Sequence, residues 1–196
     1  MTKKRSLDCA SLFGLWVVGL WVGISVCPAP AQDINAIGQL IGRGDYAAAL
    51  LEAQKLEAAT KAQFGVNHTS YAYALNALAT VYLAQQKYDE AEGLYRRAMA
   101  IRAKVLGEDH LEVAHTLTNL SFMYSLQRKF AEAEGVLRRA LEIQEKALGE
   151  NDMTVATTIG LIASACLGQG KGQEADALYA RARSILDNVA RERKRP

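Results

Sequence analysis

Apolar residues recur at spacings of three, four and seven along most of this chain, and short polar stretches interrupt the pattern. Leu75, Leu78 and Tyr82 form one such stripe. These spacings place side chains on one face of a helix, so the pattern predicts helices with one buried face. Each polar break predicts a turn between two helices. The breaks fall at 85–87, 127–129 and 168–172.

The pattern itself repeats with a period of 42 residues. Residues 69–110 align with 111–152, with 18 of 42 positions identical. A further shift finds a divergent copy at 153–194, and a backward shift finds a partial first copy at 32–68. Self-similarity at this period indicates stacked structural units. We therefore predict one all-α domain over 32–194, in which each copy is a helical hairpin.

Several positions are assigned to helix ends and to close contacts. Asp89 and Glu92 have the spacing of a capping box, which would start the second helix of the second copy. Gly107 suits the left-handed residue that ends that helix, and the third copy keeps this glycine as Gly149. His68 and His110 occupy the same slot of successive loops and are expected to cap helix ends. Small side chains recur where helices must approach closely, at Ala79, Ala91 and Ala98, and again at Ser121, Ala133 and Ala140.

The motifs that carry a family resemblance lie in the two middle copies. They are Leu75-Asn76-Ala77-Leu78-Ala79, Tyr82, Lys87-Tyr88-Asp89-Glu90-Ala91-Glu92, Leu94-Tyr95-Arg96-Arg97-Ala98 and Leu106-Gly107, with the corresponding residues of the third copy. The chain resembles the tetratricopeptide repeat (TPR), in its 42-residue, kinesin-light-chain-like variety. The resemblance covers about Asp33 to Lys194 and implies a TPR-like alpha solenoid, a right-handed superhelical array of antiparallel helix pairs. It also implies a concave groove that binds peptides or other proteins.

The resemblance also indicates which residues would line that groove. In this repeat class the first helix of each pair lines it. The inward positions carry Tyr73, Asn76, Thr80, Leu83, His115, Thr118, Phe122, Ser125, Thr157, Gly160, Ser164 and Leu167. None of these is lysine or arginine, whereas capture of a C-terminal carboxylate calls for charge-assisted hydrogen bonds. We therefore expect an extended or helical ligand held by amides, hydroxyls and aromatic rings. Packing of Phe122 between copies is the alternative for that residue.

The first 31 residues have the three-part plan of a secretory signal peptide. Lys3-Lys4-Arg5 precedes an apolar run from Leu12 to Val26, and Ala29-Pro30-Ala31 fits a cleavage site after Ala31. The prediction is an exported protein, periplasmic or secreted. Two alternatives stay open: the segment is kept as an inner-membrane anchor, or Cys27 is lipidated. After cleavage no membrane association is expected.

Charge and cysteine content argue against nucleic-acid binding and indicate a structural role for the remaining cysteine. Removal of residues 1–31 takes away three of 23 basic and one of 21 acidic residues, leaving 20 of each. A neutral chain gives no electrostatic support for binding nucleic acid. Cys166 is the only cysteine after residue 31, and it falls at an inward helix position, where we expect a buried structural thiol.

Other candidate chemistry finds no support in the residue pattern. No Cys/His/Asp cluster has metal-ligand spacing, and no third group orients His115 and Cys166 for nucleophilic catalysis. Arg43-Gly44-Asp45 matches a cell-adhesion tripeptide but falls where the first copy needs its turn. We therefore predict no catalytic, cofactor-binding or metal-binding residues and no cofactor.

The fourth copy departs from the pattern of the others. Gly172 replaces the aromatic residue of Tyr88 and Phe130, and Arg191 replaces the glycine of Gly107 and Gly149. We expect this copy to be frayed or differently capped. No polar capping helix follows, and an uncapped apolar end of an array tends to self-associate. The sequence thus predicts a protein-interaction module or scaffold that binds a protein or peptide and can form a homodimer through its fourth copy. The alternatives are a membrane-anchored adaptor or assembly factor and a self-associating structural protein. An enzyme has the least support from the sequence.

Overall fold

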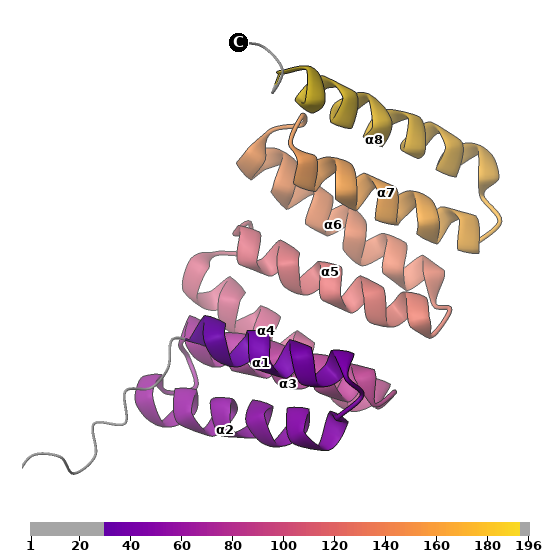
Figure 1. The fold of residues 1–196 in the computed structure, drawn as a ribbon. Helices are drawn as coiled ribbons and strands as arrows, with labels where there is room; N and C mark the ends of the chain where they lie inside the picture. The colour runs from indigo at the N-terminus through magenta and orange to yellow at the C-terminus, as the bar shows by residue number, and fades with distance from the viewer. Residues whose placement is uncertain (1–29, 193–196) are drawn as a thin grey trace, which may run out of the picture.

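A computed structural model describes residues 30–192 as eight helices joined by short turns (Figure 1). They form four antiparallel pairs that stack in chain order from α1 to α8. The predicted leader lies almost wholly outside the described residues, and its predicted end at Ala31 falls in the first turn of α1. The helices are α1 Pro30–Gly42, α2 Tyr46–Phe64, α3 Thr69–Ala84, α4 Tyr88–Leu106, α5 Leu111–Leu126, α6 Phe130–Leu148, α7 Met153–Gly168 and α8 Gly172–Glu192.

The predicted helical periodicity is confirmed along the array. The first helices α3, α5 and α7 each have 16 residues, and the second helices α4 and α6 each have 19. The turn between α1 and α2 contains Arg43 and Gly44, as expected for that tripeptide, and Asp45 caps α2 by accepting a hydrogen bond from the Ala48 amide at 3.1 Å. None of the helices within 30–192 is both long and apolar enough to cross a membrane.

The small residues that recur in the middle copies are buried in the core. Ala79, Ala91 and Ala98 are fully buried, and their counterparts Ser121, Ala133 and Ala140 are buried too. Larger side chains fill the spaces between copies. Tyr95 of α4 clusters with Leu120, Met123 and Tyr124 of α5. The apolar core therefore continues from one pair to the next, because each second helix is covered by the first helix of the following copy.

The histidine caps are confirmed. Nδ1 of His68 accepts from the Ser70 amide at 3.1 Å, and Nδ1 of His110 accepts from the Glu112 amide at 3.2 Å. Asp152 takes the same slot before α7 and accepts from the Thr154 amide at 2.6 Å. Each side chain thus satisfies one of the free amides at a helix start.

The capping box predicted at Asp89 and Glu92 is wrong. Helix α4 begins at Tyr88, and Lys87 stands at its N-cap without a side-chain hydrogen bond to the backbone. The start of α6 at Lys129 is the same. The carboxylate of Glu92 points elsewhere, because it accepts hydrogen bonds from Arg96 and from the hydroxyl of Tyr124 in the next copy. Both helices therefore start without a side-chain cap.

The glycines at the ends of the second helices have the positive φ that favours glycine. Gly107 has φ 99° and Gly149 has φ 85°, but their ψ values of 153° and 158° are extended, so the left-handed helical conformation predicted for Gly107 is wrong in ψ. In the fourth copy the corresponding residue, Arg191, continues the helix, so α8 runs to Glu192. The fourth copy therefore ends differently from the others, as expected: α8 continues past the position at which α4 and α6 end.

Candidate functional site

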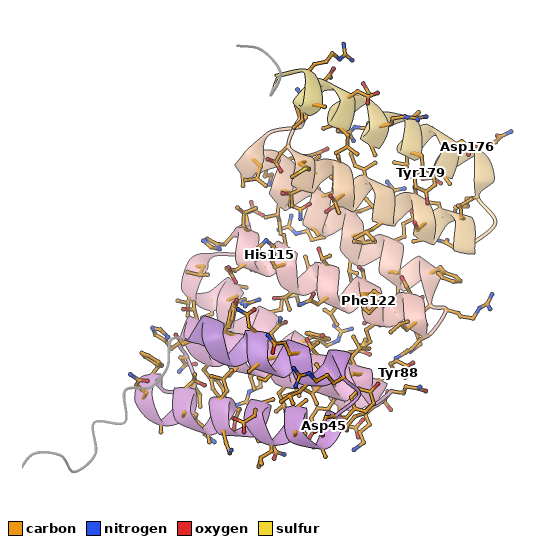
Figure 2. All side chains as sticks on the ribbon, in the orientation of Figure 1. Asp45, Tyr88, His115, Phe122, Asp176 and Tyr179 are labelled. Carbon is orange, nitrogen blue, oxygen red and sulfur yellow. The ribbon has the colours of Figure 1, made fainter. Side chains whose placement is uncertain are left out.

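The first helices of the four pairs line an open hollow of about 640 Å³, which we call the groove. Its residues come from α1, α3, α5 and α7, and two side chains reach it from the second helices α4 and α6. The position of His115 on α5 can be followed in Figure 2. The lining residues are Ile37, Gly38, Ile41, Tyr73, Asn76, Ala77, Thr80, Arg102, Glu112, His115, Thr118, Asn119, Gln144, Met153, Thr154, Thr157, Thr158 and Leu161.

Six of the residues assigned to the groove from the sequence line this hollow: Tyr73, Asn76, Thr80, His115, Thr118 and Thr157. Leu83 does not, and its assignment is corrected, because its side chain is 7% exposed and belongs to the core between α3 and α4. Ser125 and Ser164 also lie beyond the hollow's lining, as do Gly160 and Leu167. Phe122 lies further along α5, where it is 58% exposed and therefore is not packed between copies (Figure 2).

Three threonine hydroxyls of the groove are already used as donors. Thr80, Thr118 and Thr157 each donate to the backbone carbonyl four residues earlier, at 2.9–3.0 Å. A hydroxyl carries one hydrogen and two acceptor lone pairs. These side chains therefore offer acceptors to a ligand, and a ligand that contacts them must bring its own donors.

A buried arginine from a second helix forms part of the groove floor. Arg102 is 2% exposed, and its Nη2 lies 3.0 Å from Oε2 of Glu112. Its Nη1 donates to Oγ1 of Thr116 at 2.6 Å and to the carbonyl of Glu112 at 3.2 Å. The guanidinium also lies over the ring of Tyr73, 5.7 Å from its centroid. These contacts join the second copy to the third beneath the groove.

Electrostatic compensation leaves this floor close to neutral. Burial lowers the pKa of Arg102, and the nearby carboxylate of Glu112 opposes that effect. Arginine stays protonated in proteins, so the charge persists and Glu112 balances it. The groove thus contains a cation that was not predicted from the sequence, but that cation is already paired and does not attract a ligand carboxylate strongly.

Three buried polar atoms along the groove have no hydrogen-bond partner among the described residues. They are Oδ1 of Asn76, Oε1 of Gln144 and Nε of Arg102. Gln144 and Arg102 occupy corresponding slots of α6 and α4, and both are 2% exposed. An unpartnered buried polar group destabilises the protein unless it gains a partner. Polar atoms of this kind concentrate on one surface of the array.

A signal in the sequence marks these two side chains of the second helices, although neither was predicted to reach the groove. Arg102 follows Ala91, Tyr95 and Ala98 at spacings of four, three and four, so it lies on the buried stripe of α4. Gln144 has the same place on α6. A charged or amide side chain on an apolar stripe indicates a polar contact inside the fold.

Comparison with known proteins agrees with this architecture. A family model for the tetratricopeptide repeat matches residues 35–104, 70–146 and 122–188. The chain belongs to the tetratricopeptide repeat family. A search of curated protein sequences found no significant match. Repeats of this family are generally protein-interaction modules and typically non-enzymatic scaffolds.

Solved TPR structures share the fold at low sequence identity. BtubC (BKLC) from P. vanneervenii superposes with a TM-score of 0.72 at 21% identity, over 85% of this chain and 66% of that one. The TPR-like repeats of a kinesin light chain from Podosopora anserina give 0.53 at 18% identity, over 83% and 98% of the two chains. The N-terminal domain of stress-induced protein-1 from C. elegans gives 0.51 at 18% identity, over 64% and 97%. The TPR solenoid of the kinesin-light-chain-like variety, which the repeat predicted, is thus confirmed. The chain spans 66% of the length of BtubC.

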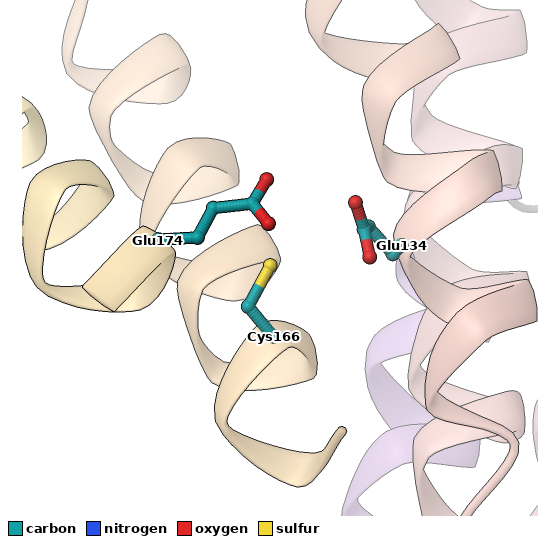
Figure 3. Close-up of side chains that lie close together, drawn as sticks. All are labelled: Glu134, Cys166 and Glu174. Atoms are coloured by element: carbon teal, nitrogen blue, oxygen red, sulfur yellow. The ribbon is translucent and has the colours of Figure 1, made fainter. Parts of the chain in front are cut away.

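A second polar cluster of this TPR chain lies between the third and fourth copies (Figure 3). A carboxylate oxygen of Glu134, a carboxylate oxygen of Glu174 and Sγ of Cys166 all lie within 4.8 Å of one another. The carboxylate of Glu134 accepts hydrogen bonds from Lys171 Nζ at 2.9 Å and Gln169 Nε2 at 2.7 Å, and Arg138 bridges both glutamates.

These contacts explain the electrostatics of the cluster. Hydrogen bonding from Lys171 is the main cause that lowers the pKa of Glu134 to about 2, against the opposing effect of burial. Burial is also the main cause that raises the pKa of the Cys166 thiol. The cluster therefore connects the third and fourth copies through ion pairs and hydrogen bonds. A metal ion could bind these side chains only if the ion pairs were broken. Arg138 itself is exposed and also forms the i,i+4 ion pair with Glu134 on α6.

Proposed function

We propose that this TPR chain is a protein-interaction module that holds a segment of another protein against the first-helix surface. The observation that carries the proposal is the open groove across α1, α3, α5 and α7, continued by the exposed ring of Phe122. Exposed aromatic side chains beside a concave surface with a few polar groups are suited to anchor a peptide.

The groove chemistry favours a ligand segment without net charge. Its threonine hydroxyls present acceptors, and the Arg102 guanidinium is balanced by Glu112. A peptide backbone supplies both amide donors and carbonyl acceptors, so it can satisfy hydroxyls and the amide of Asn76 together. The segment is extended or helical, with an apolar side chain placed against Tyr73 or Phe122. A ligand selected by its C-terminal carboxylate, or a nucleic acid, does not fit this charge balance.

Peptide selection tests the proposal and does not require an identified partner. Peptides from a random library are selected on residues 30–196, which contain all eight helices, and their affinities are measured by fluorescence polarisation. Asn76→Ala combined with Phe122→Ala is expected to weaken binding about tenfold or more, the loss of one aromatic anchor and one amide. The matched control is Glu90→Ala with Glu132→Ala, two exposed residues on the second helices.

Either variant can bind like the original protein, and the two results mean different things. Equal affinity of the groove variant, with helical content retained by circular dichroism, would contradict a function in the groove. Loss of binding in the control variant alone would move the binding surface to the second helices.

The proposal includes an exported location and self-association. The three-part leader at 1–31 supports export to the periplasm or the exterior, and a retained leader would instead make a membrane-anchored adaptor. Terminal sequencing of the fractionated protein distinguishes the two, because cleavage leaves Gln32 as the first residue. We include a homodimer through the fourth copy in the same proposal. Neither part of the proposal depends on catalysis.

A further inference from the structure

The last helix carries large side chains in slots that are buried in every preceding copy. Tyr179 of α8 is 39% exposed, whereas its counterparts Tyr95 and Leu137 are each 1% exposed. Leu186 is 44% exposed, whereas Arg102, at the same slot of α4, is 2% exposed. Figure 2 shows Tyr179 and Asp176 on α8, at the end of the stack. In the preceding copies, the first helix of the following copy covers these positions. On α8 the same positions form an exposed face that no described residue covers.

The backbone of α8 does not turn as its counterparts do. Helices α4 and α6 end at Gly107 and Gly149, where positive φ values lead the chain to the next first helix. At the same slot Arg191 is helical, and α8 continues to Glu192. The chain thus does not make the turn that lays a following helix on α8 in the other copies. A different occupant is needed for this face.

Charged residues on α8 indicate what that occupant carries. At two of the three internal junctions the slot of Asp176 holds an acidic residue that reaches a donor of the next copy: Glu92 accepts from Tyr124 at 2.8 Å, and Glu134 accepts from Lys171 at 2.9 Å. Asp176 and Arg183 are both exposed and have no ion-pair partner among the described residues. Seven residues apart, they lie on one face two turns from each other.

This spacing is self-complementary. In an antiparallel pair of identical helices, Asp176 of each copy lies opposite Arg183 of the other when Tyr179 and Ala180 sit at the two-fold axis. The exposed residues Ala177, Ala180 and Ser184 are small and allow the helices to approach closely. From these observations we infer that the occupant is a second copy of this chain, joined α8 to α8 in antiparallel orientation through two reciprocal Asp176–Arg183 ion pairs.

The opposite end of the array disfavours a head-to-tail contact. In α3 the side chains that pack on the preceding copy include Ala77, Leu78 and Val81. The corresponding residues of α1 are Asn35, Ala36 and Gln39, all exposed. A polar face of this kind caps an array and does not replace an apolar covering helix. The contact therefore closes as a pair and does not extend into a filament.

This inference rests on the proposed self-association and is independent of the groove. Sedimentation velocity of residues 30–196 is measured from about 5 to 200 µM, because one helix pair buries less surface than a standard stable interface. The original protein is expected to move from monomer to dimer in this range. Asp176→Arg and Arg183→Asp each place like charges opposite each other twice, and each is expected to weaken the dimer about tenfold or more.

An equimolar mixture of the two variants is the decisive sample. In the mixed pair, the arginine introduced at position 176 of one chain faces the aspartate introduced at position 183 of the other. The unchanged Arg183 of the first chain likewise faces the unchanged Asp176 of the second, so dimerisation is expected to return. Lys104→Asp, a charge reversal at an exposed site of α4, is the control and should dimerise normally.

The outcomes separate this contact from self-association in general. A monomer at every concentration would overturn self-association itself. A dimer that the single variants do not weaken, a mixture without recovery, or growth beyond a dimer would overturn the antiparallel α8 contact and leave self-association standing.

Discussion

Glu134 connects the third and fourth copies through its carboxylate. Removing the negative charge of this side chain is expected to weaken the contact between the two copies. The Glu134 side chain is 11% exposed and forms ion pairs with Lys171 at 2.9 Å and Arg138 at 2.7 Å. Gln169 donates a third contact at 2.7 Å. Glu134→Gln keeps the shape of the side chain and removes the charge. The folded protein then loses the ion pair with Lys171, which crosses the junction between α6 and the turn before α8, and the ion pair with Arg138 within α6.

The pKa of this carboxyl sets the size of the effect. A folded-state pKa of about 2 against about 4.3 in an unfolded chain corresponds to at most about 3 kcal/mol of stability at neutral pH. The cationic partners are nearly half exposed, at 44% for Lys171 and 47% for Arg138, so water screens part of this energy. We expect Glu134→Gln to lower the free energy of unfolding by about 1–2 kcal/mol at pH 7. That loss corresponds to a melting temperature lower by roughly 2–8 °C in a chain of this size.

The dependence on pH distinguishes this effect from a general loss of packing. Because the pKa is depressed in the folded state, the carboxylate stabilises the protein fully above pH 5 or so. That contribution disappears as the pH falls from about 4.3, where the unfolded state takes up a proton, to about 2, where the folded state does. Urea unfolding of the original protein and the variant at pH 7, 5 and 3 should therefore show a stability difference that is constant at the two higher values and smaller at pH 3.

Glu132→Gln is the matched control, because Glu132 lies on the same helix and is exposed without an ion pair among the described residues. It should change stability by less than about 0.5 kcal/mol at every pH. A Glu134→Gln difference that does not shrink between pH 5 and pH 3 would refute the electrostatic reasoning. The loss would then arise from packing alone.

Further predictions concern single positions of the fold, each tested by thermal unfolding. Gly168→Ala should destabilise the protein by about 1–3 kcal/mol, because the added Cβ would lie 2.5–2.6 Å from ring atoms of Phe130. Gly160→Ala on the same helix is the control and should be neutral or stabilising, because its Cβ would meet nothing within 4 Å. Equal effects of the two substitutions would contradict the contact with Phe130. Gln86→Gly should stabilise by up to about 1 kcal/mol, because Gln86 has φ 61°, and a loss would show that its side chain matters more than its backbone. Glu112→Ala should cost about 3 kcal/mol by leaving a buried guanidinium without its carboxylate, while Arg102→Met should cost less than about 1.5 kcal/mol; the reverse order would argue against the buried ion pair.

Much of the fold could be predicted from the sequence because each copy has the same local pattern. The stripe that includes Leu75 and Leu78 specifies a helix face, and a repeat of 42 residues places that face in the same environment each time. The cap at His68 was also predictable, since the same residue type recurs at His110 before a helix start. Features that each copy determines for itself were therefore open to sequence reasoning.

Contacts between copies were less predictable, because they depend on which faces meet in space. Glu92 was assigned to its own helix end from local spacing, yet its carboxylate binds Tyr124 of the next copy. Leu83 was placed in the groove by its position on α3, although packing against the second helix buries it. The ion pair of Arg102 and Glu112 joins residues from two helices, and no single helical stripe contains both.

Site-specific photocrosslinking tests the binding account most directly. A photoreactive amino acid is placed at position 122, on the exposed surface of α5 beside the groove, and at position 132, on the exposed side of α6, in the full chain expressed in its natural host. The account predicts a crosslinked protein partner from position 122 and none from position 132. Crosslinks from position 132 alone, or equal products from both positions, would contradict a binding surface formed by the first helices.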